Sequence, residues 1–256
     1  MTDNANDGVF TQVPRWTAPR HSASGPGEHH EELPAELVRD LERGAAALGV
    51  ARADLLLAAH ARVAATLATE RELLLGLVAP GRQVPGPLRV TVAASSWREL
   101  VAHAAAVAAD LPEGPARAEL VLDLGVLNSP DGPGSTDAQL GDGEVIRVVC
   151  VPDGADGTGL RLRVLFDRAA VDEEYAARVA GYHMAALRLL ADDPDAAHHR
   201  QSLLSPPRWR SSCTACRGAG WRCRRAPSWS CSRSRCARAA TGWRRRTAAP
   251  TGRTTS

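Results

Sequence analysis

The chain has no lysine: all 31 of its basic residues are arginine, a bias typical of a gene rich in G and C. Aromatic residues are scarce, at 4%. The sequence also lacks an apolar run of about 18 residues and a basic-then-apolar leader, so we expect neither a membrane-spanning helix nor secretion and place the protein in the cytoplasm. Its 256 residues, 44% hydrophobic and 23% charged, have the composition of a globular protein with one large domain or two small ones.

The net charge of +2 averages two unlike parts of the chain. Met1 to Pro207 contains 18 arginines and all 29 acidic residues, a balance of −11. Arg208 to Ser256 contains the other 13 arginines, five of the six cysteines and four of the six tryptophans, but no acidic residue and no Leu, Ile, Val, Phe, Tyr or Met. Because this part has no apolar periodicity, we expect a disordered Arg/Cys/Trp-rich tail over residues 206–256.

The remaining pattern predicts an N-terminal arm over residues 1–32, rich in Gly, Pro and Ser, and a mixed α/β domain over residues 33–205. Apolar residues at helical spacing predict helices over 34–48, 52–68, 97–108 and 172–191. Ser96 and Glu99 form a capping box at the start of the third helix. Apolar runs predict strands over 73–79, 88–92, 119–124, 145–151 and 160–166. Helices and strands do not alternate regularly, which favours a mixed sheet covered by helices.

Several short motifs follow this pattern in order. They are Val13-Pro14-Arg15, Ala79-Pro80-Gly81-Arg82, Pro87-Leu88-Arg89-Val90, Phe166-Asp167, Asp193-Pro194 and Leu203-Leu204-Ser205. Together they resemble the second half of a nonribosomal peptide synthetase condensation domain, from the segment between its two lobes to the linker that follows it. The resemblance covers Val13 to Pro207. It implies the C-terminal lobe of a chloramphenicol acetyltransferase-like fold, an α/β lobe with a mixed β-sheet covered by helices.

The resemblance also implies a reaction. Condensation domains join an acyl donor and an amine acceptor, each held as a thioester on the phosphopantetheine arm of a carrier protein, and form an amide in secondary metabolite biosynthesis. Peptidyl or aminoacyl carrier proteins and an adenylation domain are the implied partners. Phosphopantetheine would arrive on those carriers, and we expect no cofactor to be bound directly.

The family's catalytic His-His-x-x-x-Asp-Gly motif is absent from this sequence. His29-His30 and His198-His199 lack the Asp and Gly at the required spacing, and no Asp-Phe-Gly-like segment occurs near Asp123-Leu124-Gly125. We therefore expect a truncated lobe that is not catalytically competent alone, with no catalytic, cofactor-binding or metal residues. The alternative is a non-catalytic docking or scaffold lobe. Because an isolated lobe exposes its former partner surface, self-association is also expected.

The other candidate groups have simpler interpretations. His60 and His183 lie at apolar helical spacing and are expected in the core, whereas His103 is expected on a helix surface and both His-His pairs in solvent. Cys150 ends an apolar strand and should behave as a small buried hydrophobe. Asp131-Gly132 and Asp153-Gly154 are typical of turns.

The tail allows three hypotheses. Cys213-x-x-Cys216 is its one tight cysteine pair, whereas zinc domains use two such pairs and an apolar core, which disfavours a metal site. Arginine interleaved with tryptophan suits nucleic acid only weakly, and we expect none. The third hypothesis is translation out of frame. Codons for Cys and Trp begin with TG, so in a shifted frame each of the nine Cys and Trp residues of the tail becomes Leu, Val or Met. The shifted stretches resemble the linker after a condensation domain and the opening of an adenylation domain. We favour this hypothesis.

Overall fold

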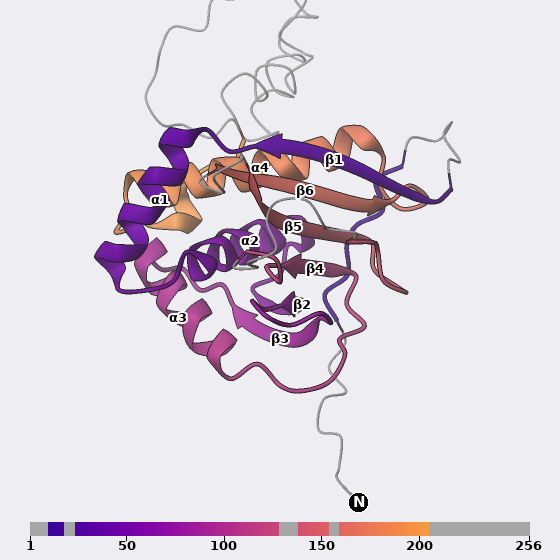
Figure 1. Cartoon of the computed structure of the whole chain (residues 1–256), viewed down its shortest axis with the longest axis horizontal. Helices are drawn as coiled ribbons and strands as arrows, with labels where there is room; N and C mark the ends of the chain where they lie inside the picture. Colours follow the sequence, from indigo (N-terminus) through magenta and orange to yellow (C-terminus); the bar gives the residue numbers. More distant parts are fainter. Residues whose placement is uncertain (1–9, 18–23, 128–137, 154–158, 205–256) are drawn as a thin grey trace, which may run out of the picture. The chain divides into compact units, whose positions relative to one another are not determined.

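A single mixed sheet organises the protein. The computed structural model describes residues 10–17, 24–127, 138–153 and 159–204, so the tail predicted over 206–256 lies outside the described residues. The strands are β1 (Pro26–Glu32), β2 (Glu72–Val78), β3 (Gly86–Thr91), β4 (Leu120–Asp123), β5 (Ile146–Asp153) and β6 (Gly159–Asp167). They form a six-stranded sheet in the order β1-β6-β5-β4-β2-β3, with β1 and β3 at its edges (Figure 1).

The sheet combines a parallel centre with antiparallel flanks. Strand β4 pairs in parallel with β2 and β5, whereas the outer pairs β2–β3, β5–β6 and β1–β6 are antiparallel. The mixed α/β architecture predicted from the sequence is confirmed, and each of the five predicted strands is present. The prediction of an arm over residues 1–32 is wrong for Pro26–Glu32, which forms β1 at the edge of the sheet.

The four helices are α1 (Ala35–Leu48), α2 (Arg52–Ala68), α3 (Trp97–Ala109) and α4 (Glu173–Asp192). Local chemistry sets their ends. Helix α1 stops at Gly49, whose φ of 68° is a left-handed conformation that glycine adopts without strain. The predicted capping box begins α3, because the Ser96 hydroxyl accepts from the Glu99 amide and the Glu99 carboxylate accepts from the Ser96 amide. The Asp172 carboxylate accepts from the Tyr175 amide at the start of α4.

The helices pack on one face of the sheet and enclose the main core. This core contains residues of all four helices together with alternate strand residues, such as Leu75 of β2, Leu122 of β4 and Phe166 of β6. No single helix in the described residues is long and apolar enough to cross a membrane. Helices α1 and α2 would reach that length only as a pair, and they are bent by 104° relative to each other.

The opposite face of the sheet is covered by segments without helix. Phe10 packs near Val78 and Val121, and Leu140 packs near Val149 and Leu165. Among the described residues the only large hydrophobic side chains that are exposed are Val84 and Leu204. The expectation of self-association stays a prediction, because partly buried hydrophobic residues such as Phe10, Val126 and Leu140 lie on this face.

The N-terminal segment of residues 10–17 is fastened across this second face. The Thr11 amide donates to the Leu74 carbonyl (3.1 Å), and the Leu74 amide donates back to the Thr11 hydroxyl (3.0 Å). Further along, the Trp16 amide donates to the carbonyl of Ala170 (2.7 Å) and the Trp16 carbonyl accepts from the amide of Asp172 (2.9 Å). The segment therefore joins β2 to the start of α4, and it crosses one end of the sheet on the way.

Candidate functional site

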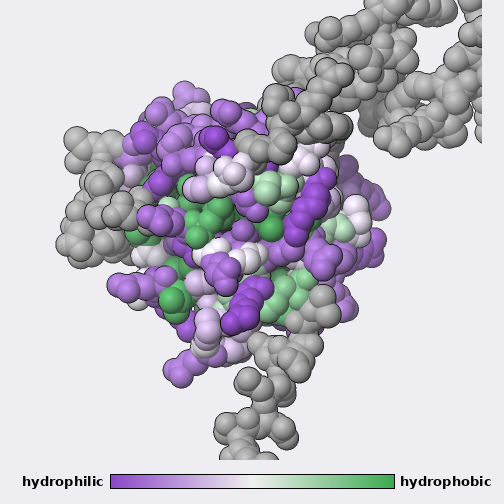
Figure 2. Space-filling model, turned by 90° about the vertical axis from the view of Figure 1, so that its right-hand side faces the viewer, coloured by the Kyte–Doolittle hydropathy of each residue, from purple (hydrophilic) through white to green (hydrophobic). Residues whose placement is uncertain are grey.

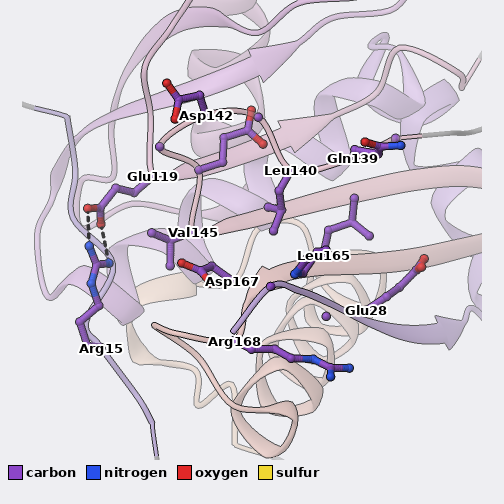
Figure 3. Close-up of a pocket in the computed structure, with 17 residues that line it drawn as sticks. Arg15, Glu28, Glu119, Gln139, Leu140, Asp142, Val145, Leu165, Asp167 and Arg168 are labelled. Carbon is purple, nitrogen blue, oxygen red and sulfur yellow. Dashed lines mark hydrogen bonds and ion pairs between the residues drawn. The ribbon is translucent and has the colours of Figure 1, made fainter. Parts of the chain in front are cut away.

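A large pocket lies at the end of the sheet where β1, β4 and β5 begin and β6 ends (Figure 3). Its volume is about 1080 Å³. Figure 2 faces this end of the sheet and shows hydrophobic side chains gathered near the centre of the view, with hydrophilic ones around them. The pocket brings together residues that are far apart in the sequence: Arg15, Glu28, Glu119, Asp142, Asp167 and Arg168.

Strand ends position most of these side chains. Glu119 comes directly before β4, Asp167 is the last residue of β6, and Glu28 is in β1. The ring of Phe166 in β6 lies against Gly27 of β1, because Gly27 has no side chain: a Cβ atom at this position would lie 2.3 Å from Cζ of Phe166. The rigid sheet therefore fixes one wall of the pocket.

Arg15 and Glu119 form the tightest contact in the pocket (Figure 3). The guanidinium donates from Nη2 to Oε1 (2.7 Å) and from Nη1 to Oε2 (3.0 Å). The Val13 amide donates to the same Oε2 atom (2.8 Å). Burial opposes ionisation of Glu119, but these hydrogen bonds outweigh it, and the pKa of Glu119 is lowered. Glu119 is therefore the anchor for the N-terminal segment.

A buried ionic cluster supports the wall of the pocket. Arg147 donates to Glu144 through Nε (2.9 Å) and Nη2 (2.8 Å), and it approaches Asp123 through Nη1 (3.4 Å). All three residues are at most 8% exposed. Burial raises the pKa of Asp123, and the Gly125 amide and Arg147 oppose this only in part. The cluster holds Glu144 in place at the beginning of β5.

The pocket is acidic and has an apolar wall. Its carboxylates are Glu28, Glu119, Glu144, Asp142 and Asp167, and its guanidiniums are Arg15 and Arg168. Leu140, Val145 and Leu165 supply apolar surface. The described residues that line it include no His, Cys, Ser or Lys. These groups can bind a cationic or hydrogen-bond-donating partner, whereas nucleophilic or imidazole-based catalysis here would need a group from elsewhere.

The structure confirms the core prediction for His60 and His183, which are 1% and 3% exposed. It also brings their rings together, with Nδ1 of His60 3.0 Å from Nε2 of His183. His103, expected on a helix surface, is half-buried, and its Nε2 accepts from the Thr91 amide at the edge of β3 (3.2 Å).

The prediction of solvated His-His pairs holds only in part. His30 is exposed on β1, with 53% of its side chain accessible, but His29 is half-buried. The prediction is wrong for His198, which is completely buried in a 3-10 turn (His198–Arg200), beside the ring of Trp97 and the hydroxyl of Ser95. Trp97 and Ser95 belong to the start of α3, about 100 residues away in the sequence, so local spacing gave no sign of this burial.

Cys150 is buried as predicted, and burial raises the pKa of its thiol. Asp153, which we assigned to a turn, is the last residue of β5 and binds Arg161 (2.7 Å). Asp131-Gly132, Gly154 and the tail cysteines lie outside the described residues. No group of three or more His, Cys, Asp or Glu side chains that could hold a metal ion occurs in the described part of the chain.

Sequence reasoning did not identify the pocket residues. Two signals were available: Glu119 is a charged residue directly before the apolar run that forms β4, and Asp142 lies between two glycines, as in an exposed turn. Neither signal says that the two residues meet. Only the strand order, which places the beginnings of β4 and β5 beside the end of β6, brings them to one pocket.

No protein family model and no curated protein matches the sequence. Solved structures match its fold. They include a four-domain nonribosomal peptide synthetase bound to AMP and glycine (TM-score 0.62, 12% identity) and the first condensation domain of the calcium-dependent antibiotic synthetase (0.55, 18%). A third is the X-domain of teicoplanin biosynthesis in complex with OxyB (0.61, 16%).

These matches cover 78%, 71% and 78% of this chain. They cover only 19% of the four-domain synthetase, 49% of the condensation-domain chain and 53% of the X-domain chain. The chain therefore spans about half the length of the single domains that it matches. The fold is condensation-domain-like α/β, as the sequence motifs predicted.

Proposed function

We propose that this chain supplies the C-terminal lobe of a condensation-domain-like enzyme of nonribosomal peptide biosynthesis, and that it forms no amide by itself. The observation that carries the proposal is the condensation-domain-like fold, which matches about half of each solved domain. The absence of His-His-x-x-x-Asp-Gly from the sequence supports the second part. The proposed partners are a lobe that carries this motif, carrier proteins with phosphopantetheine arms, and an adenylation domain, all in the cytoplasm.

The acidic pocket is the proposed contact for the other lobe. It lies where Arg15 and Val13 are anchored, and Val13-Pro14-Arg15 resembles the segment that joins the two lobes in the family. A complementary lobe should present basic or hydrogen-bond-donating groups to Asp142 and Asp167, because the ion pairs found among the described residues include neither of these carboxylates.

The test is complementation. The full chain is mixed with a first lobe that carries the histidine motif and with two carrier proteins loaded with aminoacyl thioesters, and amide formation on the acceptor arm is followed by mass spectrometry. We expect no product from the chain alone and product from the pair. Asp142→Arg should weaken pairing and product formation, whereas Asp40→Arg, a matched change on the distant helix α1, should not. Product from the chain alone would overturn the proposal.

The second candidate is a non-catalytic docking domain. The specific observation in its favour is the match to an X-domain that was solved in complex with a partner protein, OxyB. In the same experiment, a docking domain would bind its partner through the acidic pocket, and Asp142→Arg would abolish that binding. It would form no amide with any lobe that carries the histidine motif.

A further inference from the structure

A second pocket, of about 320 Å³, lies beside helix α2 and away from the acidic one. Four segments form it: α2 (Arg62, Thr66), the turn after α2 (Glu70, Arg71), the residues after β3 (Val92 to Ala94) and the 3-10 turn (His198, His199). Among these described lining residues two are arginines and one, Glu70, is a carboxylate, which is exposed. This is a local excess of positive charge in a part of the chain that is acidic overall.

Arg62 is the unusual residue of this pocket. Its guanidinium is half-buried, and its described contacts are with neutral oxygens: the carbonyls of His198 (3.3 Å) and Gln201 (3.4 Å) and the Thr66 hydroxyl. None of the ion pairs found among the described residues includes Arg62. Burial without a counter-charge lowers the pKa of Arg62. A half-buried cation that lacks an anion is costly, and an anionic ligand would offset that cost.

The surrounding residues favour an anion of tetrahedral shape. Arg71 is exposed, and its side chain has no partner in the described part of the chain, so it is free to turn toward a ligand. His199 of the 3-10 turn also lines the pocket and is exposed. Donors that approach from α2, from the turn after α2 and from the 3-10 turn can each reach a different oxygen of a phosphate, whereas a planar carboxylate offers only two.

His198 completes the wall in its neutral form. Burial, and after it the positive charge of Arg62, lower the pKa of His198 to about 4. The imidazole therefore adds no charge to the site near pH 7, and the arginines supply the attraction for an anion.

From these contacts we propose that the pocket formed by Arg62, Arg71, His198 and His199 binds a phosphate group. The phosphate belongs either to the inorganic ion or to a monoester. A third pocket, of about 170 Å³, shares Thr66 with this one and is lined by Trp16, Tyr175 and Tyr182, so it offers the organic part of an ester an aromatic surface. The proposal does not depend on the amide-forming role proposed above.

The experiment is calorimetric titration of the full chain with inorganic phosphate and, separately, with phenyl phosphate. The tail arginines can also attract phosphate, so the informative quantity is the change between variants that all keep the tail. We expect Arg62→Gln to weaken the saturable component roughly tenfold, since charge-assisted hydrogen bonds are lost, and Arg71→Ala to weaken it by a few fold. Arg188→Ala, which removes an exposed arginine from α4, is the matched control and should bind as the parent does.

Arg62 also holds two carbonyl groups, so Arg62→Gln must be checked for folding by its thermal unfolding curve. Arg71→Ala changes an exposed side chain and carries the test if Arg62→Gln unfolds. Phenyl phosphate that binds more tightly than phosphate identifies an ester as the ligand, and equal affinities identify the inorganic ion. If the parent shows no saturable component, or if Arg188→Ala loses as much as Arg71→Ala, the pocket is not a phosphate site and Arg62 serves only to bind the two carbonyls.

Discussion

Arg147 is the residue whose replacement we expect to lower the stability of the protein most. It is buried between the carboxylates of Glu144 and Asp123, so these two acidic groups depend on it for their charge compensation. A buried pair adds little net stability, because both charges lose their hydration, but removal of one partner leaves the other uncompensated.

We therefore expect Arg147→Met to lower the free energy of unfolding by about 3–5 kcal/mol, although methionine fills much of the same space. Urea unfolding measures this. The control is Arg89→Met on β3, an exposed strand arginine, for which a change within about 0.5 kcal/mol is expected. A similar, small effect of both substitutions would show that Arg147 is hydrated in solution.

Two glycines give a matched pair with opposite expectations. A Cβ atom at Gly27 would overlap the ring of Phe166, whereas a Cβ atom at Gly44, within α1, would meet nothing within 4 Å. Gly27→Ala should therefore destabilise the protein by about 1–3 kcal/mol through overpacking. Gly44→Ala should stabilise it by about 0.5–1 kcal/mol, because alanine favours the helix. Thermal unfolding of both variants tests the assignment of β1, and a neutral Gly27→Ala would contradict the packing of β1 on β6.

At the scale of elements, a hydrogen bond between the rings of His60 in α2 and His183 in α4 joins the two helices, and the neighbouring groups determine which ring nitrogens carry hydrogen. Nδ1 of His183 lies 2.8 Å from the Val179 carbonyl, which can only accept, so this nitrogen carries the hydrogen. Nε2 of neutral His183 is then an acceptor, and Nδ1 of His60 donates to it. Nε2 of His60 is left as a buried acceptor without a partner in the described residues. A proton added to either ring would place a charge in this apolar interface.

This arrangement predicts a loss of stability in acid. Burial lowers the pKa of His183 to about 4, and burial is also the main cause that lowers the pKa of His60 well below 6.5. The unfolded chain binds protons below about pH 6.5 and the folded chain does not, so stability falls as the pH drops from 6.5 toward 4. For His183 alone the loss between pH 7 and pH 5 is about 2 kcal/mol.

Urea unfolding at pH 7 and pH 5 measures this loss. The double variant His60→Leu, His183→Leu should lose much less stability than the parent over the same interval, and His30→Gln, at an exposed ring of β1, is the control. An unchanged pH dependence in the double variant would assign the acid sensitivity to other groups.

Elements with strong periodicity could be predicted from the sequence, and elements defined by distant partners could not. Helix α2 is bounded as predicted, because its apolar residues recur at helical spacing over five turns. Strand β1 was missed because Pro-Gly-Glu-His-His-Glu-Glu has no alternating apolar residues: it is an edge strand whose charges pair with Arg161 and Arg163 of β6. The acidic pocket was missed for the same reason, since Arg15, Glu119 and Asp167 meet only through the strand order.

At the scale of the whole molecule, the division of charge at residue 207 separates two parts of unlike composition. Out-of-frame translation predicts that the DNA beyond the codon for Ser205, read in the shifted frame, continues as an adenylation domain. It also predicts that a chain without Arg208 to Ser256 keeps the proposed pairing activity. The opposite result would be a stop codon soon after Ser205 in the shifted frame, together with loss of zinc or nucleic-acid binding when the tail is deleted. In that case the cysteines and arginines of the tail would be a selected feature.

The pairing of β1 with β6 has a consequence during synthesis. Glu28 of β1 binds Arg163 of β6, 135 residues later in the chain. A ribosome that adds about 5–20 residues per second needs about 7 to 27 s to cover that interval, and β1 leaves the exit tunnel before its partner strand is made. Neighbouring ribosomes on one message hold other copies at different stages, so a finished β6 can capture the β1 of the next chain. The charges of β1 keep that strand soluble while it waits.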